Sequence, residues 1–216
     1  MGLSGNDSFT YRVRDSYGSY SDTVRVNISI DDKKTVAYND TNDSLYASAV
    51  NDVVDRGIMQ TSNSADGEYF NPKDPVSRID FLIMTMKSMG AGDPNPVNNT
   101  PFYDDITLTD EEKGYLSAAY ELGIINGSSE NGKLIFNPDE AVTGAAASVI
   151  LNGILGLESA NANTSLEDNT VPACASTAYQ ALTDEGIIDP YIAPCNSVLT
   201  RENTAVILSH IIHRLA

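Results

Sequence analysis

Basic side chains are scarce in this chain of 216 residues. Lys and Arg number 13 against 30 Asp and Glu, which gives a formal net charge of −17. A protein that binds a phosphate backbone uses Lys and Arg to displace counterions, so this balance excludes nucleic acid as a partner. Long apolar runs are absent too: the stretch 145–151 falls far short of the roughly 20 residues that a membrane-spanning helix needs. We therefore expect neither nucleic-acid binding nor membrane insertion.

Cysteine and histidine are almost absent, with two of each. Cys174 and Cys195 form no Cys-x-x-Cys pair, and the chain offers no metal-ligand spacing. A helix would place His210 and His213 one turn apart, but packing or exposure to solvent explains them better than a metal does. We predict no cofactor and no metal site. If the chain is extracellular, we predict a disulfide between the two cysteines, and the alternative is two buried thiols.

The sequence also lacks the signatures of catalysis. It contains no Gly-x-Ser-x-Gly elbow, no metal-binding histidine pair and no phosphate-binding glycine loop. Glycosidases need two carboxylates at a fixed separation, and 30 acidic residues along the chain do not identify such a pair. Tryptophan is absent, so stacking on sugar rings would fall to tyrosine or phenylalanine. We predict a protein that is not an enzyme.

Residues 8–30 have the strict alternation of two β-strands, with Phe9 and Tyr11 on the first and Val24 and Val26 on the second. A lone hairpin is marginally stable, so we expect residues 1–32 to end a domain whose earlier part precedes them. They resemble the last strands of bacterial Ig-like or cadherin-like tandem repeats. The alternative is a hairpin that docks on the rest of the chain. The first residues have no basic or apolar signal region, and we expect the signal peptide in the missing part.

The remainder of the chain contains repeats. Three blocks recur at one ungapped offset of 66 residues, from 57 to 123 and from 70 to 136. They are Gly57-Ile58-Met59 with Gly123-Ile124-Ile125, Phe70-Asn71-Pro72 with Phe136-Asn137-Pro138, and Pro75-Val76-Ser77-Arg78 with Ala141-Val142-Thr143-Gly144. A third, shorter copy contains Gly186-Ile187-Ile188 and Leu199-Thr200-Arg201, and it has lost the Phe-Asn-Pro block.

Each copy has the same predicted order of elements. A first helix ends in a glycine, the residue favoured after a helix C-terminus. A polar connection follows, and a second helix begins at Ser77, Thr143 or Thr200, whose hydroxyls suit an N-cap. The first helices are expected at 47–56, 111–122 and about 173–185. Apolar stripes behind the N-caps predict that the second helices pack in the core.

This order of motifs resembles the S-layer homology (SLH) domain. The opening aromatic-x-Asp blocks are Tyr38-Asn39-Asp40, Tyr103-Asp104-Asp105 and, more loosely, Leu166-Glu167-Asp168. The family's Thr-Arg-Ala-Glu motif is matched by Ser77-Arg78-Ile79-Asp80, Thr143-Gly144-Ala145-Ala146 and Thr200-Arg201-Glu202-Asn203. The expected repeats are residues 36–92, 100–157 and 164–216. The resemblance implies a mainly α fold, in which three repeats form a pseudo-threefold spindle with a central three-helix bundle, preceded by the β-hairpin.

The resemblance also implies anchoring to a cell-wall polysaccharide, often one that carries a pyruvate ketal. A cation in the first turn of a helix opposes the helix dipole, whereas exposed N–H groups and a guanidinium fork together would bind a carboxylate. We therefore place the glycan site at Arg78 and Arg201, with Ser77 and Thr200 beside them. Gly144 predicts that the second copy has lost this contact.

Asp40, Asp105 and Tyr103 complete the candidate glycan site. The alternative for the two aspartates is capping of the following turns, and for Tyr103 it is packing. The alternative for each arginine is a local ion pair with a neighbouring carboxylate: Asp74 or Asp80 for Arg78, and Glu202 for Arg201.

The sequence thus predicts the anchoring module of a secreted surface protein, located at the cell wall and bound to an anionic polysaccharide, for example a pyruvylated one. The alternative is an assembly module that binds neighbouring surface-layer proteins without a glycan. Calcium at Asp15, Asp31 and Asp32 is a further alternative, although no complete calcium loop is present.

Overall fold

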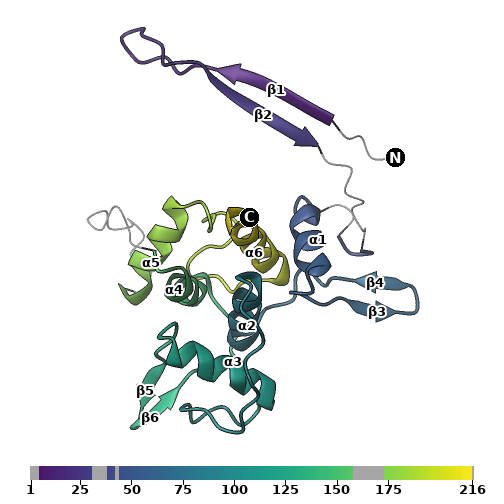
Figure 1. The fold of residues 1–216 in the computed structure, drawn as a ribbon, viewed down its shortest axis with the longest axis vertical. Coiled ribbons are helices and arrows are strands. Elements are labelled where there is room, and N and C mark those ends of the chain that lie inside the picture. Colours follow the sequence, from purple (N-terminus) through teal and green to yellow (C-terminus); the bar gives the residue numbers. More distant parts are fainter. Residues whose placement is uncertain (1–4, 31–37, 42–43, 158–172, 216) are drawn as a thin grey trace. The chain divides into compact units, whose positions relative to one another are not determined.

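A computed structural model describes residues 5–30, 38–41, 44–157 and 173–215 (Figure 1). The chain separates into two units, Met1–Val36 and Ala37–Ala216, and each is described by itself. The predicted opening block of the third copy, Leu166-Glu167-Asp168, lies outside the described residues, as do Asp31 and Asp32.

The first unit is a two-stranded antiparallel hairpin. Strand β1 (Gly5–Tyr11) pairs with β2 (Val24–Ile30), and Phe9 lies opposite Val26 in the register. The alternating apolar residues of the two strands therefore share one face of the ribbon, where Phe9 is 53% exposed. The Asp15 carboxylate closes the turn by accepting hydrogen bonds from the N–H groups of Tyr17 and Ser19, at 2.9 and 2.8 Å.

The second unit is mainly helical. Its described helices are α1 (Ala47–Asp55), α2 (Arg78–Ser88), α3 (Asp110–Glu121), α4 (Gly144–Leu155), α5 (Ala173–Asp184) and α6 (Arg201–Leu215). Two short hairpins project from it: β3 (Ser62–Ser64) with β4 (Gly67–Tyr69), and β5 (Ser128–Glu130) with β6 (Lys133–Ile135) (Figure 1). Within the described part, no helix combines the length and apolar character needed to cross a membrane.

The predicted helix ends are present. The hydroxyl oxygens of Ser77, Thr143 and Thr200 accept hydrogen bonds from the N–H groups three residues later, at 3.1, 3.3 and 3.2 Å. The glycines that follow α1, α3 and α5 have φ values of 69°, 72° and 67°. This left-handed conformation ends a helix at little cost when no Cβ is present.

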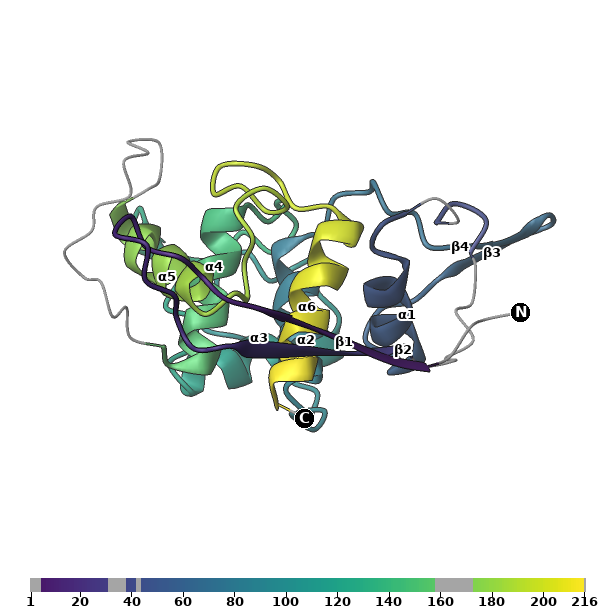
Figure 2. The same cartoon turned by 90° about the horizontal axis from the view of Figure 1, so that it is seen from above.

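The helices pack in a cyclic order. Helix α1 packs on α6, α3 on α2, and α5 on α4, while α2 also contacts both α4 and α6 (Figures 1 and 2). Each first helix of a predicted copy thus packs on the second helix of the copy before it, and α1 packs on the second helix of the last copy. The apolar core runs through all of these contacts.

A closed ring of backbone hydrogen bonds joins the segments that precede α2, α4 and α6. The N–H of Val76 donates to the carbonyl of Leu199 at 3.1 Å, Leu199 donates to Val142 at 2.8 Å, and Val142 donates back to Val76 at 2.8 Å. All three residues are buried. The ring uses the equivalent position of each copy and fixes the starts of the three central helices relative to one another.

Candidate functional site

The starts of the three second helices are bound to backbone from a neighbouring copy. The N–H groups of Arg78 and Ile79 donate to the carbonyls of Glu140 and Pro138, at 2.9 and 3.1 Å. The equivalent pairs are Arg201 and Glu202 with Asp74 and Pro72, and Gly144 and Ala145 with Ser197 and Cys195. These donors are therefore already used. The expectation that exposed N–H groups at these helix starts would bind an anion is wrong.

The Arg78 side chain crosses to the second copy. Its Nε donates to the carbonyl of Phe136 at 3.0 Å, and its guanidinium carbon lies 4.9 Å from the centroid of the Phe136 ring. Burial lowers the pKa of Arg78, an effect that Glu140 and Asp104 oppose. Among the described residues no carboxylate forms a salt bridge with Arg78, so the predicted alternative of a local ion pair is not found there.

Arg201 makes the equivalent contact from the third copy to the first. Its Nε donates to the carbonyl of Phe70 at 2.8 Å, and its guanidinium lies 4.7 Å from that ring. A terminal nitrogen of Arg201 also donates to the carbonyl of Gln60. Burial lowers the pKa of Arg201, against the charges of nearby aspartates. Glu202 pairs with Lys73 rather than with Arg201.

Gly144 occupies the position that corresponds to the two arginines. A Cβ added there would lie 2.4 Å from the carbonyl oxygen of Pro194 and 3.0 Å from the Cα of Cys195. The shortened connection of the third copy thus fills the space that an arginine would need. The shortened connection, which lacks Phe-Asn-Pro, therefore explains why position 144 has no room for an arginine.

Two grooves lie beside the arginines. The groove at Arg78 has a volume of about 510 Å³, and its wall includes Asn126, Phe136, Val149 and Ile150. The groove at Arg201 has a volume of about 260 Å³, and the offset of 66 places Gln60, Ile83 and Met84 at the corresponding positions. The same groove therefore occurs twice, and it is larger at Arg78.

The predicted aspartates hold turns. Asp40 accepts hydrogen bonds from the N–H groups of Phe70 and Asn71, at 2.9 and 2.6 Å, and so fixes Asn71 at a φ of 57°. Asp105 accepts from the N–H and hydroxyl of Thr100, at 3.0 and 2.9 Å. Neither contact caps the turn that follows the aspartate, which was the alternative left open by the sequence: Asp40 holds a turn 30 residues further along the chain, and Asp105 bonds back to Thr100.

The second copy is aligned one residue differently from the sequence prediction. The counterpart of Asp40 is Asp104, which accepts from the N–H groups of Phe136 and Asn137. The counterpart of the buried Tyr38 is therefore Phe102, also 3% exposed. The aromatic-x-Asp pattern Phe102-Tyr103-Asp104 was a signal for this alignment in the sequence.

Tyr103 is 65% exposed, which does not fit the alternative of packing. The ammonium group of Lys133 lies 3.3 Å from the centroid of its ring. Lys133 also lowers the pKa of Tyr103 through a hydrogen bond and its positive charge. Tyr103 is thus available at the surface beside β6, with one face of its ring covered by Lys133.

The other predicted residues are held by contacts within the fold. The Ser77 hydroxyl donates to Asp80 at 2.6 Å, and that of Thr200 donates to Asn203 at 2.9 Å. Cys195 is buried, but the Cys174 side chain lies outside the described residues, so the disulfide stays a prediction. His213 lies 2.7 Å from Asp52, and no group of three or more metal-ligating side chains occurs in the described part of the chain.

The model of the S-layer homology domain matches residues 37–82 and 102–148. The chain carries two SLH repeats. The SLH domain is generally a non-catalytic module of cell-wall anchoring. The third predicted copy and the N-terminal hairpin lie outside the matched segments.

Two relatives each match about half of this chain. An exoglucanase, XynX, from Acetivibrio thermocellus is 29% identical over 117 residues, which make up 53% of this chain and 10% of the relative. An amylopullulanase from Thermoanaerobacterium thermosulfurigenes is 27% identical over 113 residues, 51% of this chain and 6% of the relative. The chain thus matches about a tenth or less of the length of these curated relatives.

Proposed function

We propose that residues 37–216 anchor a surface protein to an anionic cell-wall polysaccharide, and that the groove at Arg78 binds its acidic group. A pyruvate ketal is the acidic group that we expect. The proposal includes a third, divergent SLH copy at 164–216 and a pseudo-threefold spindle of the three copies. The hydrogen-bond ring through Val76, Val142 and Leu199 supports both parts, because it uses equivalent residues of all three copies.

The half-buried guanidinium of Arg78 carries this proposal. Phe136 holds it from one side through its ring and its carbonyl, and its terminal nitrogens have no hydrogen-bond partner among the described residues. A carboxylate in the groove would accept two parallel hydrogen bonds from such a fork. The apolar wall formed by Val149 and Ile150 would keep water away and strengthen that contact.

Arg201 is the weaker candidate for the same role. One of its terminal nitrogens already donates to the Gln60 carbonyl, and its groove has about half the volume. Since Gly144 has no side chain to offer and its surroundings are filled, the corresponding position of the second copy contributes no cation. We therefore assign the main contact to the groove at Arg78.

Co-sedimentation with cell-wall sacculi tests the function. Sacculi of the source organism would be used before and after acid extraction of the non-peptidoglycan polysaccharide. We expect pelleting of the wild-type chain to disappear on extraction, to disappear with Arg78→Ala, and to persist with Arg56→Ala, a control at the exposed end of α1. Circular dichroism of each variant confirms that it is folded.

The remaining outcomes decide against the proposal. Pelleting that survives both extraction and Arg78→Ala would show that the ligand is peptidoglycan or a protein. If the chain does not pellet with intact sacculi, anchoring is wrong and assembly with neighbouring surface-layer proteins becomes the leading function.

We also propose that residues 1–32 are closing strands of an Ig-like repeat. The half-exposed side chains of Phe9, Tyr11 and Val24 on one face of the hairpin support this, because a two-stranded ribbon alone is marginally stable. A synthetic peptide of residues 1–36 is expected to give the NMR spectrum of an unfolded chain. Dispersed signals from the isolated peptide would contradict the proposal.

A further inference from the structure

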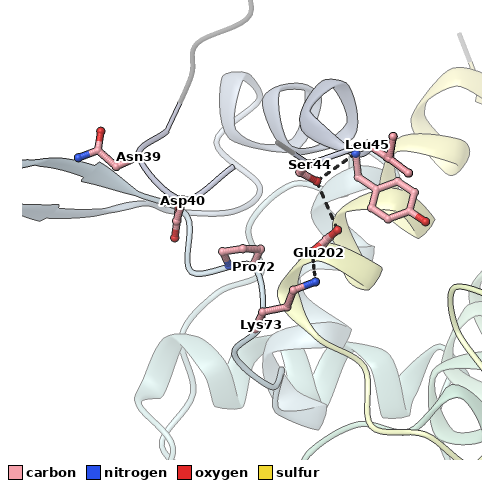
Figure 3. A pocket seen from close by; sticks show the side chains of 8 residues that line it. Asn39, Asp40, Ser44, Leu45, Pro72, Lys73 and Glu202 are labelled. Atoms are coloured by element: carbon pink, nitrogen blue, oxygen red, sulfur yellow. Dashed lines mark hydrogen bonds and ion pairs between the residues drawn. The ribbon is translucent and has the colours of Figure 1, made fainter. Parts of the chain in front are cut away.

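A third groove, of about 500 Å³, lies between the segment before α1 and the start of α6 (Figure 3). Its polar lining comprises Asn39 and Asp40 as well as Ser44, Lys73 and Glu202, and Leu45, Tyr46 and Pro72 add apolar surface. It contains neither Arg78 nor Arg201, so it is distinct from the two arginine grooves.

Glu202 is a carboxylate at a position that is apolar in the other copies. Its N–H donates to the Pro72 carbonyl, as that of Ile79 donates to Pro138 and that of Ala145 to Cys195, so the three positions are equivalent. Glu202 is only 7% exposed, and burying a carboxylate costs free energy unless it is well paired. Because the two other copies close the same junction with an apolar residue, the junction itself does not require this charge.

The Glu202 carboxylate accepts hydrogen bonds from two other side chains of the groove. The Ser44 hydroxyl accepts from the N–H of Tyr46 at 3.0 Å and donates to Glu202 Oε1 at 3.3 Å, and Lys73 Nζ donates to Glu202 Oε2 at 2.8 Å (Figure 3). Each carboxylate oxygen can accept a further hydrogen bond, and the Lys73 ammonium has two more protons to donate. The Lys73 side chain is 81% exposed. Acceptors and donors therefore lie side by side at the groove.

We propose that this groove is a carbohydrate subsite for a neutral sugar residue. Adjacent hydroxyl groups of the sugar would donate to Glu202 and accept from Lys73, and a ring face would rest on the apolar surface of Tyr46 and Pro72. The negative charge of Glu202 disfavours an acidic residue here, in contrast to the groove at Arg78. The proposal rests on the proposed function, since a wall polysaccharide is the source of such a sugar.

An NMR titration of the isotope-labelled full chain tests this assignment. The probes are N-acetylglucosamine, N-acetylmannosamine and glucose as neutral sugars, and pyruvate as the anion. We expect at least one sugar to shift the amide signals of Ser44, Tyr46 and Lys73 in a saturable manner, and pyruvate to leave those signals unchanged. The absence of saturable shifts at these amides with all three sugars would overturn the proposal.

Substitutions separate a sugar contact from a purely structural ion pair. We expect Lys73→Met to raise the dissociation constant of the sugar about tenfold or more, the usual effect of losing a charged hydrogen bond. Lys87→Met, which removes an exposed lysine of α2 outside the groove, should leave it unchanged. Equal affinity in wild type and Lys73→Met would overturn the proposal.

A second variant distinguishes loss of sugar binding from loss of the fold. Glu202→Gln keeps the shape of the side chain and removes its charge, and it should also weaken sugar binding. The sacculus assay keeps this inference apart from the proposed function. If the chain pellets through Arg78 but no sugar shifts Ser44, only the subsite is wrong. If sugars bind here but intact sacculi are not bound, the anchoring function is wrong.

Discussion

Arg78 and Arg201 connect neighbouring copies as well as lining grooves. Removing the Arg78 side chain would leave the buried Phe136 carbonyl without its donor and remove a cation–π contact. We expect Arg78→Ala to lower the free energy of unfolding by about 1–3 kcal/mol. Urea denaturation measures this, with Arg56→Ala, at the exposed end of α1, as a control of nearly unchanged stability. Equal midpoints for the two variants would show that the contact with Phe136 contributes nothing.

Gly144 is fixed by its surroundings rather than by its backbone conformation. Even a methyl group at this position would press on the Pro194 carbonyl and the Cys195 backbone, so Gly144→Ala should destabilise the protein by about 1–3 kcal/mol. Gly92→Ala is the matched control, because nothing lies within 4 Å of its added Cβ. Thermal unfolding of both variants checks this. A Gly144→Ala protein as stable as Gly92→Ala would mean that the backbone at Pro194 and Cys195 shifts at little cost. An arginine could then be accommodated at position 144.

At the scale of an element, each long connection is held by a single carboxylate. Asp104 binds two successive N–H groups at Phe136 and Asn137, where the chain turns through a positive φ of 57°. Charged hydrogen bonds of this kind contribute about 1.5–3 kcal/mol each, so Asp104→Ala should lower stability by at least about 2 kcal/mol. Asp139→Ala removes an exposed carboxylate whose one hydrogen-bond donor within the described part of the chain is Thr107, and it should cost much less. Chemical denaturation of the two variants, measured side by side, decides the point.

The helices were predictable from the sequence because their signals are local. The N-caps at Ser77 and Thr143 and the glycine after α3 lie within a few residues of the helix ends that they determine. The predicted bounds of the first helices accordingly differ from the observed ones by one residue at the ends where they differ.

The hydrogen bonds that use the first N–H groups of α2, α4 and α6 could not be predicted from local signals. The carbonyls of Glu140 and Pro138 reach the start of α2 from about 60 residues along the chain, and local patterns contain no trace of such contacts. The contact of Arg78 with Phe136 is equally distant in sequence. The assignment of Asp105 instead of Asp104 had a different cause, since both aspartates follow an aromatic residue and burial alone distinguishes Phe102 from Tyr103.

At the scale of the whole molecule, the packing of the second unit is cyclic rather than linear. In a linear repeat protein each unit contacts only its neighbours, and terminal units can be lost one by one. Here α1 packs on α6, and the hydrogen-bond ring needs Leu199 to join Val142 with Val76. The first and last copies are thus neighbours in space, and the core closes on itself.

Truncation after residue 157 should therefore also unfold the part of the second unit that remains, residues 37–157. Without α5 and α6, helix α1 loses its partner α6, helix α4 loses α5 and keeps its contact with α2, and Val76 loses its acceptor in the ring. We expect residues 37–157 to show no cooperative thermal transition, although both matched SLH repeats are retained. Residues 37–216 serve as the control and should unfold cooperatively, because their core is contained within the second unit. A cooperative transition of the truncated chain near that of the control would show that the two SLH repeats fold independently, and that the ring is a consequence of folding rather than a condition for it.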